Sequence, residues 1–197
     1  MVDCFALLNE TRRPWLDADT LKKNFLALAA EHHPDRVHEA KESVKQAATS
    51  LYAELNAAHN CLRNPRERLR HLLELELEQK PSDLTNVPDN LMDLFFEIGR
   101  EFREVDAFLA DKSRATSALM QVQCFERGQE HADRLGGLCA RILPLREALL
   151  EELRAADAAW AGASPKPLER LLDIWRLLSF YERWLAQIQE RTVRLAF

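Results

Sequence analysis

Two stretches near the amino terminus carry apolar residues at helical spacing. In the segment DADTLKKNFLALAAEHH, Leu21, Phe25 and Leu28 follow one another at i, i+4 and i+7, which predicts a helix with one buried stripe. Pro34 restricts the residue before it to extended backbone, so this helix should end near His32 or His33. The next residues, HPDRVHEAKES, are polar and predict a loop.

A second helix should follow this loop and run back along the first. Apolar side chains recur on one helix face from about Glu39 to the Asn64-Pro65 breaker, at Val44, Ala47, Ala48, Leu51, Leu55, Ala58 and Leu62. The two predicted helices would form an antiparallel hairpin with a polar tip.

The rest of the chain also reads as helix, in two regions separated by a linker. Residues 66–78 continue helically, and KPSDLTNVPDN has two prolines within eight residues. We therefore expect an amino-terminal domain over 1–78, a linker over 79–88 and a second helical domain over 89–197.

The second domain should contain three main helices. One is expected from Pro88 to about Ala110, and one from about Arg114, interrupted at Gly136-Gly137 and at Pro144. A last helix should start near Pro167. Short connections favour an up-down three-helix bundle, and the chain as a whole is predicted to be all-α.

Composition narrows the function classes. The 197 residues are 47% hydrophobic and 30% charged with 5 glycines, as in a soluble helical protein, and their net charge of -5 gives no general attraction to nucleic acid or an anionic membrane. The four cysteines are far apart in sequence and form no CxxC pair, which argues against a zinc ribbon or a dithiol redox site. The acidic start and the lack of a 20-residue apolar run predict a cytoplasmic protein.

The tripeptide His33-Pro34-Asp35 lies between the two helices of the predicted hairpin. In this context LKKNFLALAAEHHPDR resembles the second helix and loop of J domains, and YAELNAAHNCLRNPRERLRHLL resembles the third helix and its exit. The resemblance implies a co-chaperone, not an enzyme, that docks on a DnaK-type (HscA-like) chaperone and stimulates its ATP hydrolysis. It implies that docking uses His33, Pro34, Asp35, Arg36, Lys22 and Lys23.

Elementary chemistry is consistent with that role. A proline-fixed loop holds an imidazole and a carboxylate at a hairpin tip, where Asp35 can meet an arginine of the partner. The sequence departs from the usual J domain at Leu26, Ala27 and Glu31, where cations are common, so its basic face is thinned. This departure favours a dedicated partner or a weak dock.

Plainer interpretations remain open for the same residues. His32, His33, Asp35 and His38 could be a metal cluster, but histidines on either side of a proline point apart and no second ligand cluster follows. The Lys22-Lys23 pair could be a solvated helix face. Two more histidines fall on predicted helices and fit ordinary surface or core-edge positions, His59 and His71.

A short helical domain behind a J domain resembles the HscB-type iron-sulfur co-chaperones. The segments NLMDLFFEIGREFREV and RLLSFYERWLAQIQERTVRLAF are similar to the first and last helices of that family's second domain. The resemblance implies that this domain holds an IscU-type scaffold protein, with no cofactor of its own. By position, the scaffold-binding residues would be Leu91, Met92, Phe95, Phe96, Glu97 and Phe180.

The apolar pattern supports part of this patch. A core stripe needs only Leu91, Leu94, Phe95, Ile98 and Phe102, so the pattern predicts that Met92 and Phe96 face outward. The alternative is that all of these side chains belong to the core of the bundle. The acidic run is offset by one residue from the family pattern and Arg100 replaces an expected acid, so a J protein for another client is a second hypothesis. An enzyme built on the histidines lacks a paired nucleophile and base.

Overall fold

The computed structural model describes residues 2–37, 39–82, 87–112 and 118–196. Within these ranges every regular element is a helix, which confirms the all-α prediction. Contacts divide the chain into two units, one of Met1–Ser82 with Leu150–Trp175 and one of Asp83–Leu149 with Arg176–Phe197. No helix in the described ranges is long and apolar enough to cross a membrane.

The first unit contains the predicted hairpin. Helix α2 (Ala18–Glu31) and helix α3 (Glu42–Arg63) run side by side, joined through the 3₁₀ turn η1 (Pro34–Val37). Asp17 starts α2 by accepting a hydrogen bond from the backbone N–H of Thr20 at 2.8 Å. As predicted, α2 ends just before the proline.

Two further helices close this unit around one core. Short helix α1 (Cys4–Leu7) packs on α3, and α4 (Pro65–Leu77) follows α3 directly. Asn64 starts α4 by accepting from the backbone N–H groups of Arg66 and Glu67, with proline in the first turn where its missing N–H costs nothing. The core side chains that are at most 1% exposed include Phe5, Leu8, Leu21, Leu55, Ala58, Leu62, Leu69, Leu72 and Leu73.

Residues from late in the sequence also belong to this first unit. The carboxylate of Asp157 accepts hydrogen bonds from the side chain of Arg13 and, at 3.0 Å, from the backbone N–H of Trp15. The indole Nε1 of Trp160 donates to the carbonyl of Arg12 at 2.8 Å. The division of the sequence at residues 79–88 stays a prediction, and residues 83–86 of that linker lie outside the described ranges.

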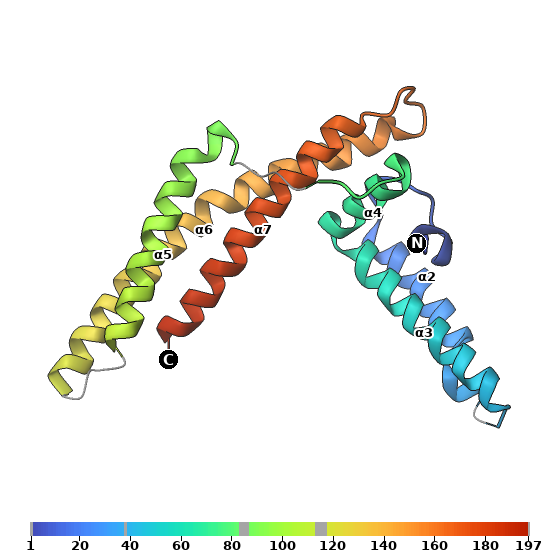
Figure 1. The fold of residues 1–197 in the computed structure, drawn as a ribbon, viewed down its shortest axis with the longest axis horizontal. Coiled ribbons are helices and arrows are strands. Elements are labelled where there is room, and N and C mark those ends of the chain that lie inside the picture. The colour runs from blue at the N-terminus through green and yellow to red at the C-terminus, as the bar shows by residue number, and fades with distance from the viewer. Residues whose placement is uncertain (1, 38, 83–86, 113–117, 197) are drawn as a thin grey trace. The chain divides into compact units, whose positions relative to one another are not determined.

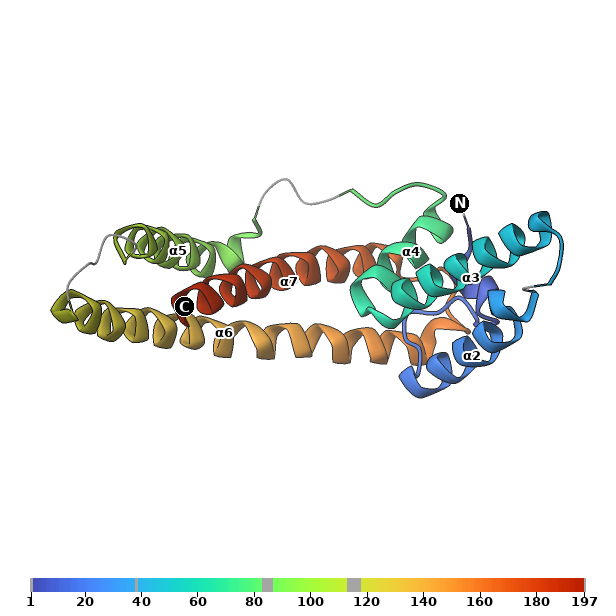
Figure 2. The ribbon, with the colours of Figure 1, turned by 90° about the horizontal axis from the view of Figure 1, so that it is seen from below.

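The second unit is a bundle of α5 (Met92–Lys112), α6 (Ala118–Trp160) up to Leu149, and α7 (Leu168–Ala196) from Arg176 onward (Figures 1 and 2). Arg191 of α7 donates to the carboxylate of Asp106 on α5 at 2.7 Å, and Lys112 donates to the carbonyl of Leu195 at 3.1 Å. The buried side chains of this unit include Leu94, Ile98, Val105, Phe108, Leu135, Leu138, Ile142, Leu178, Tyr181, Trp184 and Ile188.

The predicted interruptions of the middle helix are wrong. Helix α6 continues through Gly136, Gly137 and Pro144 for 43 residues. A glycine inside a helix costs only about 1 kcal/mol, and a proline about 3 kcal/mol. Buried leucine and isoleucine side chains on both sides of these positions hold the helix in place, so packing outweighs the local preference. The predicted start near Arg114 lies outside the described residues.

Candidate functional site

The His33-Pro34-Asp35 tripeptide lies in the connection between α2 and α3, outside both helices. The side chain of His33 is 41% exposed and that of Asp35 is 90% exposed. The backbone N–H of Asp35 donates to Nδ1 of His33 at 3.2 Å, and the carboxylate Oδ2 lies 3.6 Å from the same nitrogen. The imidazole and the carboxylate are therefore held close together at the surface.

The loop is braced by both helices of the hairpin. The ring of His33 meets the ring of Tyr52 on α3 edge-on, with centroids 5.1 Å apart and an angle of 76° between the planes. The guanidinium of Arg36 donates to the carbonyl of Ala30 near the end of α2, at 3.4 Å. Pro34 fixes one backbone angle between these contacts. A braced loop presents His33 and Asp35 with little conformational freedom to lose on binding.

The exposed face of α2 carries Lys22 and Lys23, as the docking hypothesis requires. The positions one and two turns further on are also exposed, with Leu26 at 53% and Ala27 and Glu31 open to solvent. These three side chains therefore sit where cations would contribute to the same surface. The exposed surface of α2 therefore carries fewer positive charges than that of a usual J domain, as the sequence predicts.

Arg63 of α3 is a further cation near this face, and the sequence analysis did not predict it. The ring of His59 on α3 stacks on Phe25 of α2 with centroids 4.2 Å apart. Burial, and then the positive charges of Arg63 and Lys22, lower the pKa of His59. Arg63 is exposed and follows His59 by four residues, so helical spacing alone places the two side chains on the same face of α3.

The predicted client residues of α5 lie in the second unit and differ in exposure. Phe96 is 61% exposed, which confirms that it faces outward, whereas Met92 is half-buried. Phe95 was predicted to be core and is 39% exposed, so that prediction is wrong. The core stripe passes through Leu94 and Ile98 and leaves Phe95 at its edge, where its ring meets that of Phe96 at 5.7 Å. Leu91 is buried, as expected for the core.

The other two predicted client residues are held by different neighbours. Glu97 accepts a hydrogen bond from the guanidinium of Arg141 on α6 at 2.6 Å. Phe180 is half-buried on α7, with its ring 5.8 Å from that of Trp184. Among the predicted client residues, the rings of Phe95 and Phe96 are in contact, and Glu97 is paired with Arg141 of α6.

A groove of about 280 Å³ lies between α5 and α6 beside Glu97. It is lined by three arginines and two glutamates together with small and apolar residues: Arg100, Arg134, Arg141, Glu97, Glu101, Gly137 and Leu138. Glu97 pairs with Arg141 and Glu101 pairs with Arg134, so the positive charge that these pairs leave over in the groove is that of Arg100, which replaces an expected acid.

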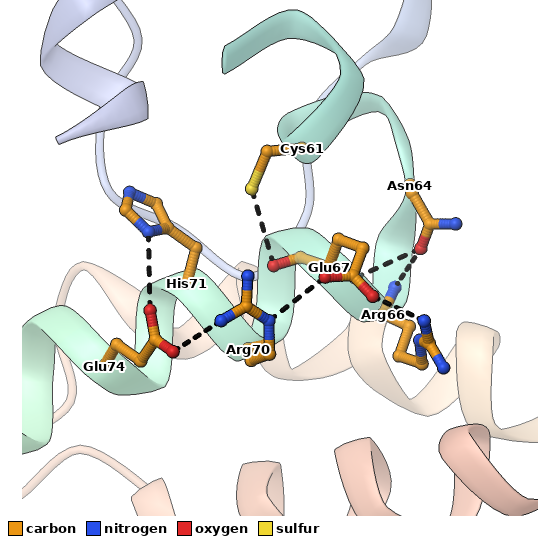
Figure 3. Close-up of polar contacts among 7 residues, drawn as sticks. All are labelled: Cys61, Asn64, Arg66, Glu67, Arg70, His71 and Glu74. Carbon is orange, nitrogen blue, oxygen red and sulfur yellow. Dashed lines mark hydrogen bonds and ion pairs between the residues drawn. The ribbon is translucent and has the colours of Figure 1, made fainter. Parts of the chain in front are cut away.

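Two groups of side chains have the donor atoms of a metal site. Cys4, Cys61 and His71 bring ligand atoms within 4.8 Å of one another, as do Glu101, Glu104 and His131. Distance along the chain had separated Cys4 from Cys61, but folding brings them together. The surroundings of Cys61 and His71 are drawn in Figure 3. The histidine cluster considered from the sequence includes His38, which lies outside the described residues.

Comparison with known proteins identifies the family. No family model matches the chain. The chain is 30% identical over 172 residues to a co-chaperone protein HscB homolog of Bordetella petrii, covering 80% of this chain and 97% of the relative. It is 31% identical over 91 residues to the HscB homolog of Chromobacterium violaceum, covering 46% of this chain and 52% of that one.

Two solved structures share the fold. The chaperone HscB from Vibrio cholerae superposes with a TM-score of 0.64 at 20% identity, over 96% of each chain. Human co-chaperone protein HscB gives a TM-score of 0.64 at 16% identity, over 98% of this chain and 83% of that one. Together with the sequence identity to the Bordetella relative, which spans nearly all of that protein, these matches show that the chain belongs to the HscB co-chaperone family.

Proposed function

We propose that this protein docks on a DnaK-type (HscA-like) chaperone through the loop at His33-Pro34-Asp35, stimulates its ATP hydrolysis, and delivers an IscU-type iron-sulfur scaffold in the cytoplasm. The exposed and braced tripeptide is the observation that carries the proposal, and membership of the HscB family supports it. Lys22, Lys23 and Arg36 would add to the docking surface.

The proposed mechanism is allosteric, with the chemistry left to the partner. The carboxylate of Asp35 is 90% exposed and suits a charge-assisted pair with a partner arginine. The cations of α2 suit an acidic groove and would mainly set how fast the two proteins meet. Docking accelerates hydrolysis if the loop binds the hydrolysis-competent state of the ATPase more tightly than the resting state.

The docking half is tested by replacing His33 with glutamine and measuring single-turnover ATP hydrolysis by the partner chaperone. We expect the His33→Gln variant to retain its helical circular dichroism, because the side chain is partly exposed, and to lose stimulation. His32→Gln is the matched control, since His32 is the neighbouring half-buried histidine and should leave stimulation intact. Undiminished stimulation by His33→Gln would refute the docking mechanism.

The client half of the proposal rests on the exposed rings of α5. A Met92→Ser/Phe96→Ser/Phe180→Ser variant should bind the scaffold more weakly in calorimetry, while stimulating the ATPase in the absence of scaffold as the unchanged protein does. Phe125→Ser is the control, because Phe125 is a 74% exposed ring of the same unit outside the proposed patch. Since Phe180 is half-buried, Phe96→Ser alone should repeat the effect without disturbing the core. Unchanged scaffold affinity in both variants would remove the patch from the proposal.

A client other than the scaffold is the second candidate, and the position of Arg100 favours it. Arg100 lines the groove between α5 and α6 beside the client patch, so an acidic segment of another protein could bind there. A direct binding measurement decides between the two: if purified scaffold does not bind the full chain, the first client assignment fails while the docking assay with His33 remains valid.

A further inference from the structure

Three soft or borderline metal ligands meet in the first unit, away from the docking loop. Cys4 comes from α1, Cys61 from α3 and His71 from α4, and one ligand atom of each lies within 4.8 Å of the others. The two cysteines are half-buried and unpaired by any disulfide, and His71 is 3% exposed. Thiolate and imidazole are the usual protein ligands of zinc.

We propose that the sulfur atoms of Cys4 and Cys61 and the Nε2 atom of His71 form a binding site for Zn²⁺, with a water molecule in the fourth position. The site is independent of the proposed docking and client surfaces. A bound ion would tie α1 to the α3–α4 corner.

The distances are compatible with a tetrahedral ion. Bonds of about 2.3 Å to sulfur and about 2.0 Å to nitrogen place the ligand atoms roughly 3.5–3.8 Å apart. The three atoms already lie within 4.8 Å, so each has to move by about 1 Å or less, which a small side-chain rotation provides. The half-buried position of both cysteines leaves room for water on one side.

The histidine is already oriented as a ligand. Its Nε2 atom accepts the backbone N–H of Cys4 at 3.0 Å, so the Nε2 lone pair points toward Cys4, and the three ligand atoms lie within 4.8 Å of one another. The ring is stacked with Phe5, with centroids 5.8 Å apart. On binding, the lone pair would change its partner from the N–H of Cys4 to the ion.

A buried carboxylate supports the same orientation from the other side of the ring. In Figure 3 the dashed line from His71 runs to Glu74, whose Oε2 lies 3.9 Å from Nδ1 of the ring. Glu74 is 5% exposed and also accepts a hydrogen bond from Arg70 at 2.5 Å, which holds its carboxylate in place. Because Nε2 accepts the N–H of Cys4, the proton of the neutral ring lies on Nδ1, the nitrogen nearer Glu74, and the Nε2 lone pair is the one available to a metal.

The donor set selects among ions. Magnesium and calcium prefer carboxylate, carbonyl and water oxygens, whereas two sulfurs and one imidazole nitrogen favour zinc. The second group, Glu101 with Glu104 and His131, has two oxygen donors, and Arg134 occupies it by donating to Glu101 at 3.0 Å. The sulfur site is therefore the better candidate for a thiophilic ion.

The test uses the full chain, freed of metal and kept reduced with a phosphine, titrated with Zn²⁺ and separately with Co²⁺. We expect one equivalent of Zn²⁺ to bind and Co²⁺ to give a thiolate-to-metal absorption band. Cys4→Ser and Cys61→Ser should each lose or weaken that band, and Cys124→Ser/Cys139→Ser should keep it. Glu74→Gln should keep the band and lower the affinity about 10–100-fold.

A second measurement needs no variant. Zn²⁺ should protect Cys4 and Cys61 of the unchanged protein from alkylation, as read by mass spectrometry, and leave the alkylation of Cys124 and Cys139 as it was. The proposal is overturned if the reduced protein gives no thiolate band with Co²⁺, or if the band follows Cys124 and Cys139, or if Zn²⁺ leaves Cys4 and Cys61 unprotected.

Discussion

Replacing Asp157 with alanine should destabilise the first unit, although this residue lies far from it in sequence. The carboxylate of Asp157 is 8% exposed and accepts from Nε of Arg13 at 2.9 Å, from Nη2 of the same guanidinium, and from the backbone N–H of Trp15 at 3.0 Å. Asp157 therefore fixes the segment between α1 and α2 to the end of α6 within one unit.

The size of the effect follows from these three bonds. A hydrogen bond to a charged group contributes about 1.5–3 kcal/mol, but Arg13 is 45% exposed and regains water when its partner is removed. The N–H of Trp15 is only part-buried, so losing its acceptor costs at most about 1–2 kcal/mol. We expect a total loss of roughly 2–4 kcal/mol of unfolding free energy.

Urea unfolding followed by tryptophan fluorescence measures this loss, because Trp15 and Trp160 both lie at the affected contacts. The midpoint should fall with the slope of the transition unchanged. Glu151→Ala is the matched control on the same helix: its side chain is 65% exposed and pairs with Arg154, so the change should stay within about 0.5 kcal/mol. A loss for Asp157→Ala as small as that of the control would contradict the reasoning.

Three further changes should have measurable effects on stability. Pro144→Ala should stabilise the protein by about 1–3 kcal/mol in urea unfolding, because it restores a backbone donor inside the continuous helix α6. Glu101→Ala should cost about 2–4 kcal/mol, because Glu101 is 6% exposed, lies 2.9 Å from His131 and accepts from Arg134; a cost below 0.5 kcal/mol would contradict this. The hydrogen bond from Arg170 lowers the pKa of the Glu152 carboxyl below its ordinary value of 4.5. The stability that this ion pair contributes is therefore complete above pH 4.5 and is lost as the pH falls through the lower pKa of the folded state. Glu152→Gln should make the loss of stability with falling pH less steep over this pH range.

The sequence predicted most helices because their boundaries depend on local chemistry. Pro34 ends α2, the Asn64-Pro65 pair separates α3 from α4, and α7 begins one residue after Pro167. The same local rules failed in α6, where a proline and two adjacent glycines lie between buried residues that pack on the bundle. Breakers indicate an end only where no tertiary packing offsets their cost.

The candidate sites show the same division between local and tertiary information. The tripeptide at His33 is contiguous in sequence, so its loop could be predicted, but its brace by Tyr52 depends on how α2 and α3 pack. Phe95 was misplaced because a residue at the edge of a helical stripe is buried or exposed according to the neighbouring helix. The meeting of Cys4 with Cys61 joins residues of two helices that only tertiary packing brings together.

The two proposed protein-binding surfaces belong to different units, and this makes them separable by mutation. The docking loop at His33 lies in the first unit and the exposed ring of Phe96 lies in the second, so the two side chains belong to different cores. Variants without a shared partner should act independently. Loss of ATPase stimulation in His33→Gln and loss of scaffold binding in Phe96→Ser should therefore each appear without the other, and a single change that abolished both activities would contradict this separation.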